Sequence, residues 1–185
     1  MLTFKEYSEF ARLSDMYPRV TGVGGQILPV YPALALMGES GELAEKIAGH
    51  RLQQVEYLNE IGDMLWYIDA AARDLGLELD RVSSSLTFGS FARMVNSADD
   101  DHEDIVTLRC VSMCSKFSEY IKKAWRDQHI APVENCRLYL QDALASLHQV
   151  STCVYSDLES AARANMAKLA SRRARGVVSG SGDNR

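Results

Sequence analysis

Apolar residues recur at helical spacing along most of this chain, and the alternating pattern of β-strands is scarce. Local signals mark some helix ends. Thr3 and Glu6, for example, form a candidate capping box before the first apolar run. The pattern predicts an all-α fold, a helical bundle whose helices lie at about 4–16, 32–48, 55–75, 79–85, 103–127 and 133–173, the last interrupted near Tyr155.

Two stretches lack this periodicity and are predicted to be loops. Residues 18–29 are rich in glycine, but no GK[ST] follows the GVGG string, which argues against a phosphate-binding loop. Residues 87–101 end in three aspartates, and we expect a solvated loop there. We expect one domain over residues 1–176, followed by a Gly/Ser-rich tail over 177–185.

The composition is that of an ordinary globular domain, since 46% of the 185 residues are hydrophobic and 24% are charged. No apolar run reaches the roughly 20 residues that cross a bilayer, and the N-terminus lacks the features of a secretory signal. We therefore expect a protein of the cytoplasm, either of a cell or of a phage-infected host, with no membrane partner. The net charge of −5 argues against a nucleic-acid partner.

The four cysteines form no CxxC pair. This spacing favours reduced, buried thiols over a zinc site.

The second half of the chain resembles the first weakly, as a degenerate internal repeat would. Sliding the sequence by 79 positions places Asp63 on Asp142 and Ile68 on Leu147, but it places Glu60 on Tyr139. Two unrelated amphipathic helices would also align in part. If the repeat is real, the first half kept the chemistry and the second became a scaffold.

Four acidic residues form the strongest chemical signal. Glu39 and Glu42 are three residues apart on one predicted helix, and Glu60 and Asp63 repeat that spacing on the next. Residues three apart share a helix face, so two packed helices would bring the four carboxylates together. Such carboxylates would repel one another unless a cation intervened, and oxygen ligands suit Mg²⁺, with Mn²⁺ as an alternative.

Other features of these helices leave two interpretations open. Gly41 and Gly62 lie inside the acidic motifs, where a glycine permits a neighbouring helix or a ligand to come close. The plain alternative is a solvated surface, on which Glu42 and Lys46 form an ordinary i, i+4 pair. Two successive acidic pairs favour a site over that alternative.

The strings ALALMGESGELAEKI and YLNEIGDMLWYIDAAARDLGLELDRV resemble the core of the MazG-like family of all-α nucleoside triphosphate pyrophosphohydrolases, which is related to dimeric dUTPases. AARANMAKLASRRARGVVSGSGDNR resembles the C-terminal helix and tail of small phage and bacterial members. The long segment between the two matches, about residues 86–150, is interpreted as an insertion into the family fold.

The resemblance implies a role for each matching residue. The metal ligands would be Glu39, Glu42, Glu60 and Asp63. Substrate contacts would come from Asn165, Lys168, Tyr67, Trp66 and Arg172, with Arg173 and Arg175 as further basic candidates. Core packing is an equally good interpretation of Trp66.

The expected reaction is metal-dependent hydrolysis of (d)NTPs between the α- and β-phosphates, which yields (d)NMP and pyrophosphate. Glu42 is the first candidate to orient or deprotonate the attacking water, and Glu39 is the second. The resemblance favours dGTP or GTP as substrate and a dimer or tetramer as the assembly. The alternative function is a non-catalytic nucleotide-binding or helical interaction module.

Overall fold

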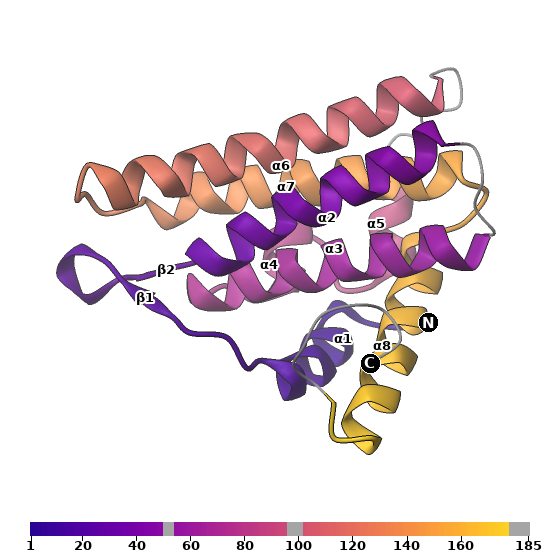
Figure 1. Ribbon diagram of the computed structural model, residues 1–185, viewed down its shortest axis with the longest axis horizontal. Helices are drawn as coiled ribbons and strands as arrows, with labels where there is room; N and C mark the ends of the chain where they lie inside the picture. The colour runs from indigo at the N-terminus through magenta and orange to yellow at the C-terminus, as the bar shows by residue number, and fades with distance from the viewer. Residues whose placement is uncertain (50–53, 96–101, 178–185) are drawn as a thin grey trace.

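The computed structural model describes residues 1–49, 54–95 and 102–177. Within these ranges the chain is almost entirely helical, as the sequence predicts (Figure 1). The helices are α1 (Phe4–Ala11), α2 (Val30–Ala48), α3 (Gln54–Asp74), α4 (Leu79–Ser83), α5 (Phe88–Met94), α6 (Glu103–Arg126), α7 (Val133–Cys153) and α8 (Leu158–Ala174).

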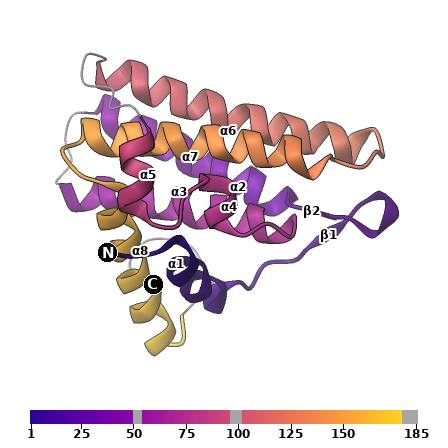
Figure 2. The same cartoon turned by 180° about the vertical axis from the view of Figure 1, so that it is seen from behind.

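The four long helices α2, α3, α6 and α7 lie side by side and form the bundle (Figure 1). Helix α6 packs against α2 and α7, while α3 packs against α2, α7 and α8. Figures 1 and 2 show α8 running across the direction of the long helices, with α1 beside it. The N- and C-terminal helices therefore meet on the flank of α3, next to the acidic motif of that helix.

Helix ends follow the local signals. Thr3 and Glu6 make both bonds of the predicted capping box. Helix α2 carries Pro32 in its first turn and has Gly49 as its C-cap, while α3 ends just before Gly76, whose φ of 70° requires little energy for glycine. These ends were predicted because capping depends on neighbouring residues alone.

The prediction of a loop over 87–101 is wrong for its first part. Residues 88–94 form α5, opened by a second capping box in which Thr87 and Ser90 bond to each other's backbone amides. The ring of Phe88 lies 4.1 Å from the ring of Phe4. This helix therefore depends on packing against the N-terminal segment as well as on local signals. Residues 96–101, the rest of that prediction, lie outside the described residues.

Smaller differences occur near the N-terminus. The first helix stops at Ala11 and continues as a short 3₁₀ turn, Arg12–Ser14, instead of reaching residue 16. The predicted loop at 18–29 contains a small antiparallel hairpin, β1 (Val20–Thr21) with β2 (Ile27–Leu28), closed by a 3₁₀ turn, Val23–Gly25. The predicted interruption near Tyr155 is confirmed, since α7 ends at Cys153 and α8 begins at Leu158.

The segment interpreted as an insertion supplies half of the bundle. Helices α6 and α7 bury the apolar sides of α2 and α3 within one chain. A second copy is therefore not needed to cover those sides, and the dimer or tetramer stays a prediction. No helix in the described ranges is long and apolar enough to cross a membrane.

The offset of 79 residues gains support from the helix bounds. When 79 is added to their residue numbers, the first and last residues of α3 coincide with those of α7, and the first residue of α4 coincides with that of α8. The order of elements also agrees, because a long helix hairpin precedes each short connection. This correspondence makes α2–α3 and α6–α7 comparable halves of the bundle.

Candidate metal centre

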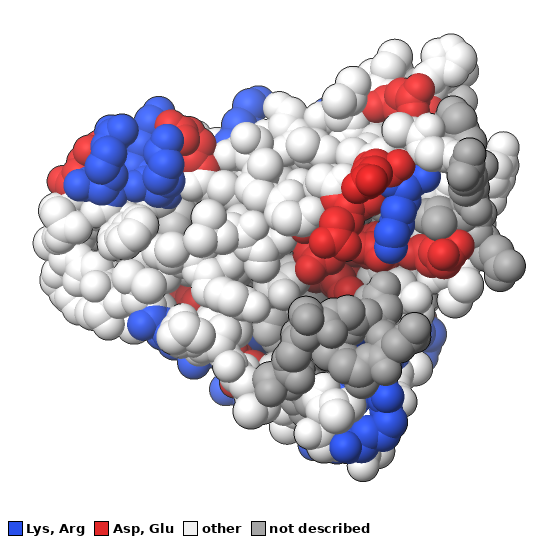
Figure 3. Space-filling model, in the orientation of Figure 1, with Lys and Arg blue, Asp and Glu red and all other residues white. Residues whose placement is uncertain are grey.

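Three of the four predicted acids converge between α2 and α3. One carboxylate oxygen from each of Glu39, Glu42 and Glu60 can be chosen so that all three lie within 4.8 Å of one another. Glu60 is buried, Glu39 is half-buried and Glu42 is exposed, so the cluster runs from the core to the surface. Figure 3 shows acidic side chains gathered on this face around a basic one.

The electrostatics of the cluster favour a bound cation. Burial, followed by the charges of Asp63, Glu42 and Glu60, raises the pKa of Glu39 to about 8, and Lys168 opposes this rise. Without a cation, Glu39 would be largely protonated at neutral pH. Three carboxylate oxygens without nitrogen or sulfur form a donor set that fits Mg²⁺ or Mn²⁺.

The fourth acid, Asp63, faces α8. Its Oδ1 accepts a hydrogen bond from Asn165 Nδ2 at 2.9 Å, and its Oδ2 forms an ion pair with Lys168. Asp63 is not among the three acids whose oxygens converge. The structure thus brings together two predicted substrate residues and a predicted metal ligand that lies more than 100 positions earlier in the chain.

Gly62 allows α8 to approach α3 this closely. A Cβ at this position would lie 2.8 Å from Cβ of Asn165 and 2.9 Å from the carbonyl oxygen of Ala161. Gly41 differs, because a Cβ there would meet nothing within 4 Å. The interpretation of a close helix approach is therefore confirmed for Gly62, while the space beside Gly41 is open.

Sequence reasoning missed two residues that contact the predicted site, Lys46 beside an acid and Tyr7 beside Asn165. Lys46 forms an ion pair with Glu60 across the α2–α3 interface, whereas the sequence suggested only its i, i+4 neighbour Glu42. Tyr7 is fully buried and donates a hydrogen bond from its hydroxyl to Oδ1 of Asn165 at 3.0 Å. No sequence signal could have found Tyr7, because its partner lies 158 positions away.

Trp66 and Tyr67 occupy different environments. The indole Nε1 of Trp66 donates to the carbonyl oxygen of Ala11 at 3.2 Å, and the guanidinium of Arg73 lies 6.0 Å from the ring centroid. These contacts support the core-packing interpretation of Trp66. Tyr67 lies closer to the acids, and burial together with its neighbour Tyr31 raises its pKa above the usual range.

Tyr31 is an aromatic residue that the sequence did not single out. It is 42% exposed, its ring stacks on Tyr17 with centroids 5.0 Å apart, and it tilts against Tyr67 at 6.2 Å. Its position on α2, two helical turns before Glu39, places an exposed ring on the same side of that helix as the acids. The signal for it in the sequence was this spacing of eight residues.

Arg172 is buried on α8, one turn after Lys168 and on the same face of the helix. Its predicted phosphate contact stays a prediction, as do those of the more exposed Arg173 and Arg175.

Comparisons of the chain with protein-family models, with curated proteins and with solved structures find no match. The function must therefore be inferred from the chain's own residues: three converging acids, a fourth bonded to α8, and two lysines that form ion pairs with the acids.

Proposed function

We propose that this protein is a metal-dependent nucleoside triphosphate pyrophosphohydrolase, which cleaves (d)NTPs to (d)NMP and pyrophosphate. The convergence of Glu39, Glu42 and Glu60 carries the proposal, because it gathers oxygen ligands from two helices at a place that reaches the surface. The approach of Lys168 to Asp63 supports it, since an ammonium beside the acids suits a phosphate group.

A triphosphate and an acidic groove repel each other, so the substrate enters together with divalent cations. Mg²⁺ would neutralise phosphate charge, orient the substrate and lower the pKa of a bound water. Glu39, Glu42 and Glu60 would hold the ion, and the burial of Glu60 and the partial burial of Glu39 would strengthen the attraction, because the local dielectric is lower than in water.

The residues of α8 would act on the phosphates. Lys168 exchanges its ion pair with Asp63 for a phosphate oxygen, which frees an oxygen of Asp63 to join the other acids. Asn165 remains bonded to the other oxygen of Asp63 and fixes its orientation.

Glu42 is the proposed general base, because it is the most exposed of the converging acids. The water oxygen attacks the α-phosphorus while its proton passes to the Glu42 carboxylate. The bond between the α-phosphorus and the bridging oxygen breaks, and pyrophosphate leaves with the electron pair. Glu39 is the second candidate for the base.

The test is pyrophosphate release from a panel of NTPs and dNTPs, with Mg²⁺, Mn²⁺ or EDTA. We expect release only with a divalent cation, and the resemblance favours GTP and dGTP within the panel. Glu42→Gln should lower kcat about 100-fold or more, as loss of a general base does. Glu45→Gln is the matched control, since Glu45 is an exposed acid on the same helix outside the cluster.

Full metal-dependent activity in the Glu42→Gln variant would rule out Glu42 as the base. The alternative function, a non-catalytic nucleotide-binding or interaction module, has one observation in its favour. Lys46 and Lys168 already compensate Glu60 and Asp63 without a cation. No pyrophosphate release from any nucleotide in the panel would favour that module and end the proposal of hydrolysis.

A further inference from the structure

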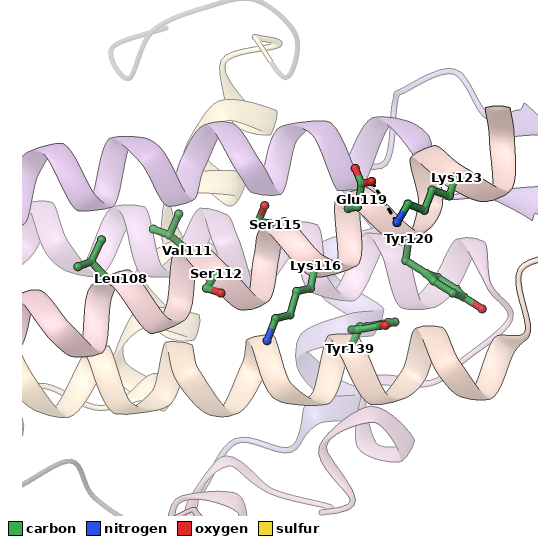
Figure 4. Close-up of a pocket in the computed structure, with 9 residues that line it drawn as sticks. All are labelled: Leu108, Val111, Ser112, Ser115, Lys116, Glu119, Tyr120, Lys123 and Tyr139. Carbon is green, nitrogen blue, oxygen red and sulfur yellow. Dashed lines mark ion pairs between the residues drawn. The ribbon is translucent and has the colours of Figure 1, made fainter. Parts of the chain in front are cut away.

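A second groove lies on the other half of the bundle, between α6 and α7 (Figure 4). Its volume is about 550 Å³, within the range of small-molecule sites. Nine residues line it, and most of them carry polar or charged groups. They are Leu108, Val111, Ser112, Ser115, Lys116, Glu119, Tyr120, Lys123 and Tyr139.

The groove carries positive charge that is not balanced locally. Its one carboxylate, Glu119, pairs with Lys122 and with Lys123, the latter at 3.4 Å. Among the residues that the structure describes, Lys116 forms no ion pair. Figure 4 shows the Lys116 side chain reaching from α6 toward α7, between Ser112 and Tyr139. The Lys116 ammonium and the Ser112 hydroxyl are both groups that can donate hydrogen bonds to a phosphate group in this groove.

Aromatic rings form one end of the same groove. The rings of Tyr120 and Tyr139 lie 5.2 Å apart at an angle of 43°. The Tyr120 hydroxyl accepts a hydrogen bond from Asn135 at 3.2 Å, which holds that ring in place. A planar group in the groove could stack on these rings while its phosphate reaches Lys116.

The α6–α7 groove and the acidic cluster differ in chemistry. The offset of 79 residues that aligns α3 with α7 places Glu60 of the acidic cluster on Tyr139 of this groove, but it places Glu39 and Glu42 on residues that do not line the groove. The acidic cluster has carboxylates, which need a cation before they can hold phosphate. The groove has lysines and tyrosines, which can hold an aromatic phosphate directly.

We propose that the α6–α7 groove binds a nucleoside monophosphate without a metal ion. Lys116 and Ser112 contact the phosphate, and Tyr139 and Tyr120 contact the base. The proposal does not depend on catalysis at the acidic cluster, because it uses none of the residues of that cluster.

The experiment is calorimetric titration of the full chain with GMP in EDTA, where the acidic cluster has no cation and repels phosphate. We expect saturable binding that Lys116→Met weakens about tenfold, because the aliphatic stem stays and only the charge is lost. Lys5→Met is the matched control, an exposed lysine of α1 that contacts no residue of the groove, and should change the affinity less than twofold.

A second pair of variants tests the aromatic end. Tyr139→Phe keeps the ring and should bind GMP as the original chain does, whereas Tyr139→Leu should weaken binding about tenfold. Circular dichroism and thermal melting of each variant establish that the bundle is intact.

Two further titrants separate the contributions of phosphate and base. Guanosine and inorganic phosphate should each bind at least tenfold more weakly than GMP. Equal binding of GMP and inorganic phosphate would overturn the base contact. No GMP binding in EDTA, or equal losses in the Lys116→Met and Lys5→Met variants, would overturn the proposal. None of these results bears on pyrophosphate release, so the two proposals can fail separately.

Discussion

The hydroxyl of Tyr7 donates a hydrogen bond to Oδ1 of Asn165 at 3.0 Å and so joins the first helix to the last. Asn165 then donates through Nδ2 to Asp63 at 2.9 Å. Because the Asp63 carboxylate can only accept hydrogen bonds, the amide nitrogen of Asn165 faces Asp63, and the amide oxygen is left to accept from Tyr7. A fully buried phenol thus satisfies the amide oxygen of the side chain that bonds to Asp63.

Tyr7→Phe tests this relationship, since it removes one oxygen and keeps the ring. The amide oxygen of Asn165 loses its buried partner, and we expect a loss of about 1–2 kcal/mol in the free energy of unfolding. The Mg²⁺ concentration for half-maximal pyrophosphate release should rise severalfold. Tyr155→Phe is the control, because Tyr155 is 93% exposed and should change neither quantity. A lower stability with an unchanged Mg²⁺ requirement would limit Tyr7 to a structural role.

Gly62 and Gly41 provide a matched pair of substitutions. Gly62→Ala should destabilise the protein by about 1–3 kcal/mol, because the new methyl group overlaps Asn165 and the backbone of Ala161. Gly41→Ala meets open space and should stabilise α2 by up to about 1 kcal/mol through helix propensity. Urea unfolding measures both effects. If the two variants unfold at the same urea concentration, then the close approach of α3 and α8 is not under steric constraint.

Glu39 links stability to pH and metal. Its pKa in the folded chain is about 8, well above the ordinary value of 4.5. Between these two pH values the unfolded chain loses the Glu39 proton and the folded chain keeps it, so rising pH lowers the stability of the folded chain. In EDTA the melting temperature should fall as the pH rises from 5 to 8, and Mg²⁺ should restore it. Glu39→Gln should flatten this dependence and reduce the effect of Mg²⁺. The same pH profile in both proteins would show that Glu39 titrates normally.

Because His148 is buried, we expect the protein to lose stability at acidic pH. His148 lies on α7 with Phe91 edge-on to its ring at 5.8 Å, and burial lowers its pKa although Asp157 opposes this. The folded chain favours the neutral imidazole, so its contribution is present above about pH 6.5 and is lost as the pH falls below that value.

Thermal melting between pH 7.5 and 5 checks this expectation. His148→Gln should show a shallower fall in melting temperature than the original chain. His129→Gln, which changes an exposed histidine, should follow the original profile. Parallel profiles for the two variants would remove His148 as a source of acid sensitivity.

Sequence periodicity determined most of the fold because helices form from local interactions. Helix α3 begins one residue before its predicted start and α2 two residues before. Helix α5 was missed because the aspartates at the end of its segment suggested a loop. Its aromatic side chains find partners on α1, where Phe88 meets Phe4 and Tyr7. A contact of that kind leaves no mark in the spacing of neighbouring residues.

The sequence by itself determined that two acidic pairs share one face on each of two successive helices. Only the tertiary structure decided which acids meet. Glu60 lies beside Glu39 and Glu42, whereas Asp63 bonds to Asn165 on α8. Asn165 can pack closely against α3 because Gly62 has no side chain. The physical reason is that side-chain periodicity follows from the geometry of one helix. Distances between helices depend instead on how residues far apart in the chain fill the space between them.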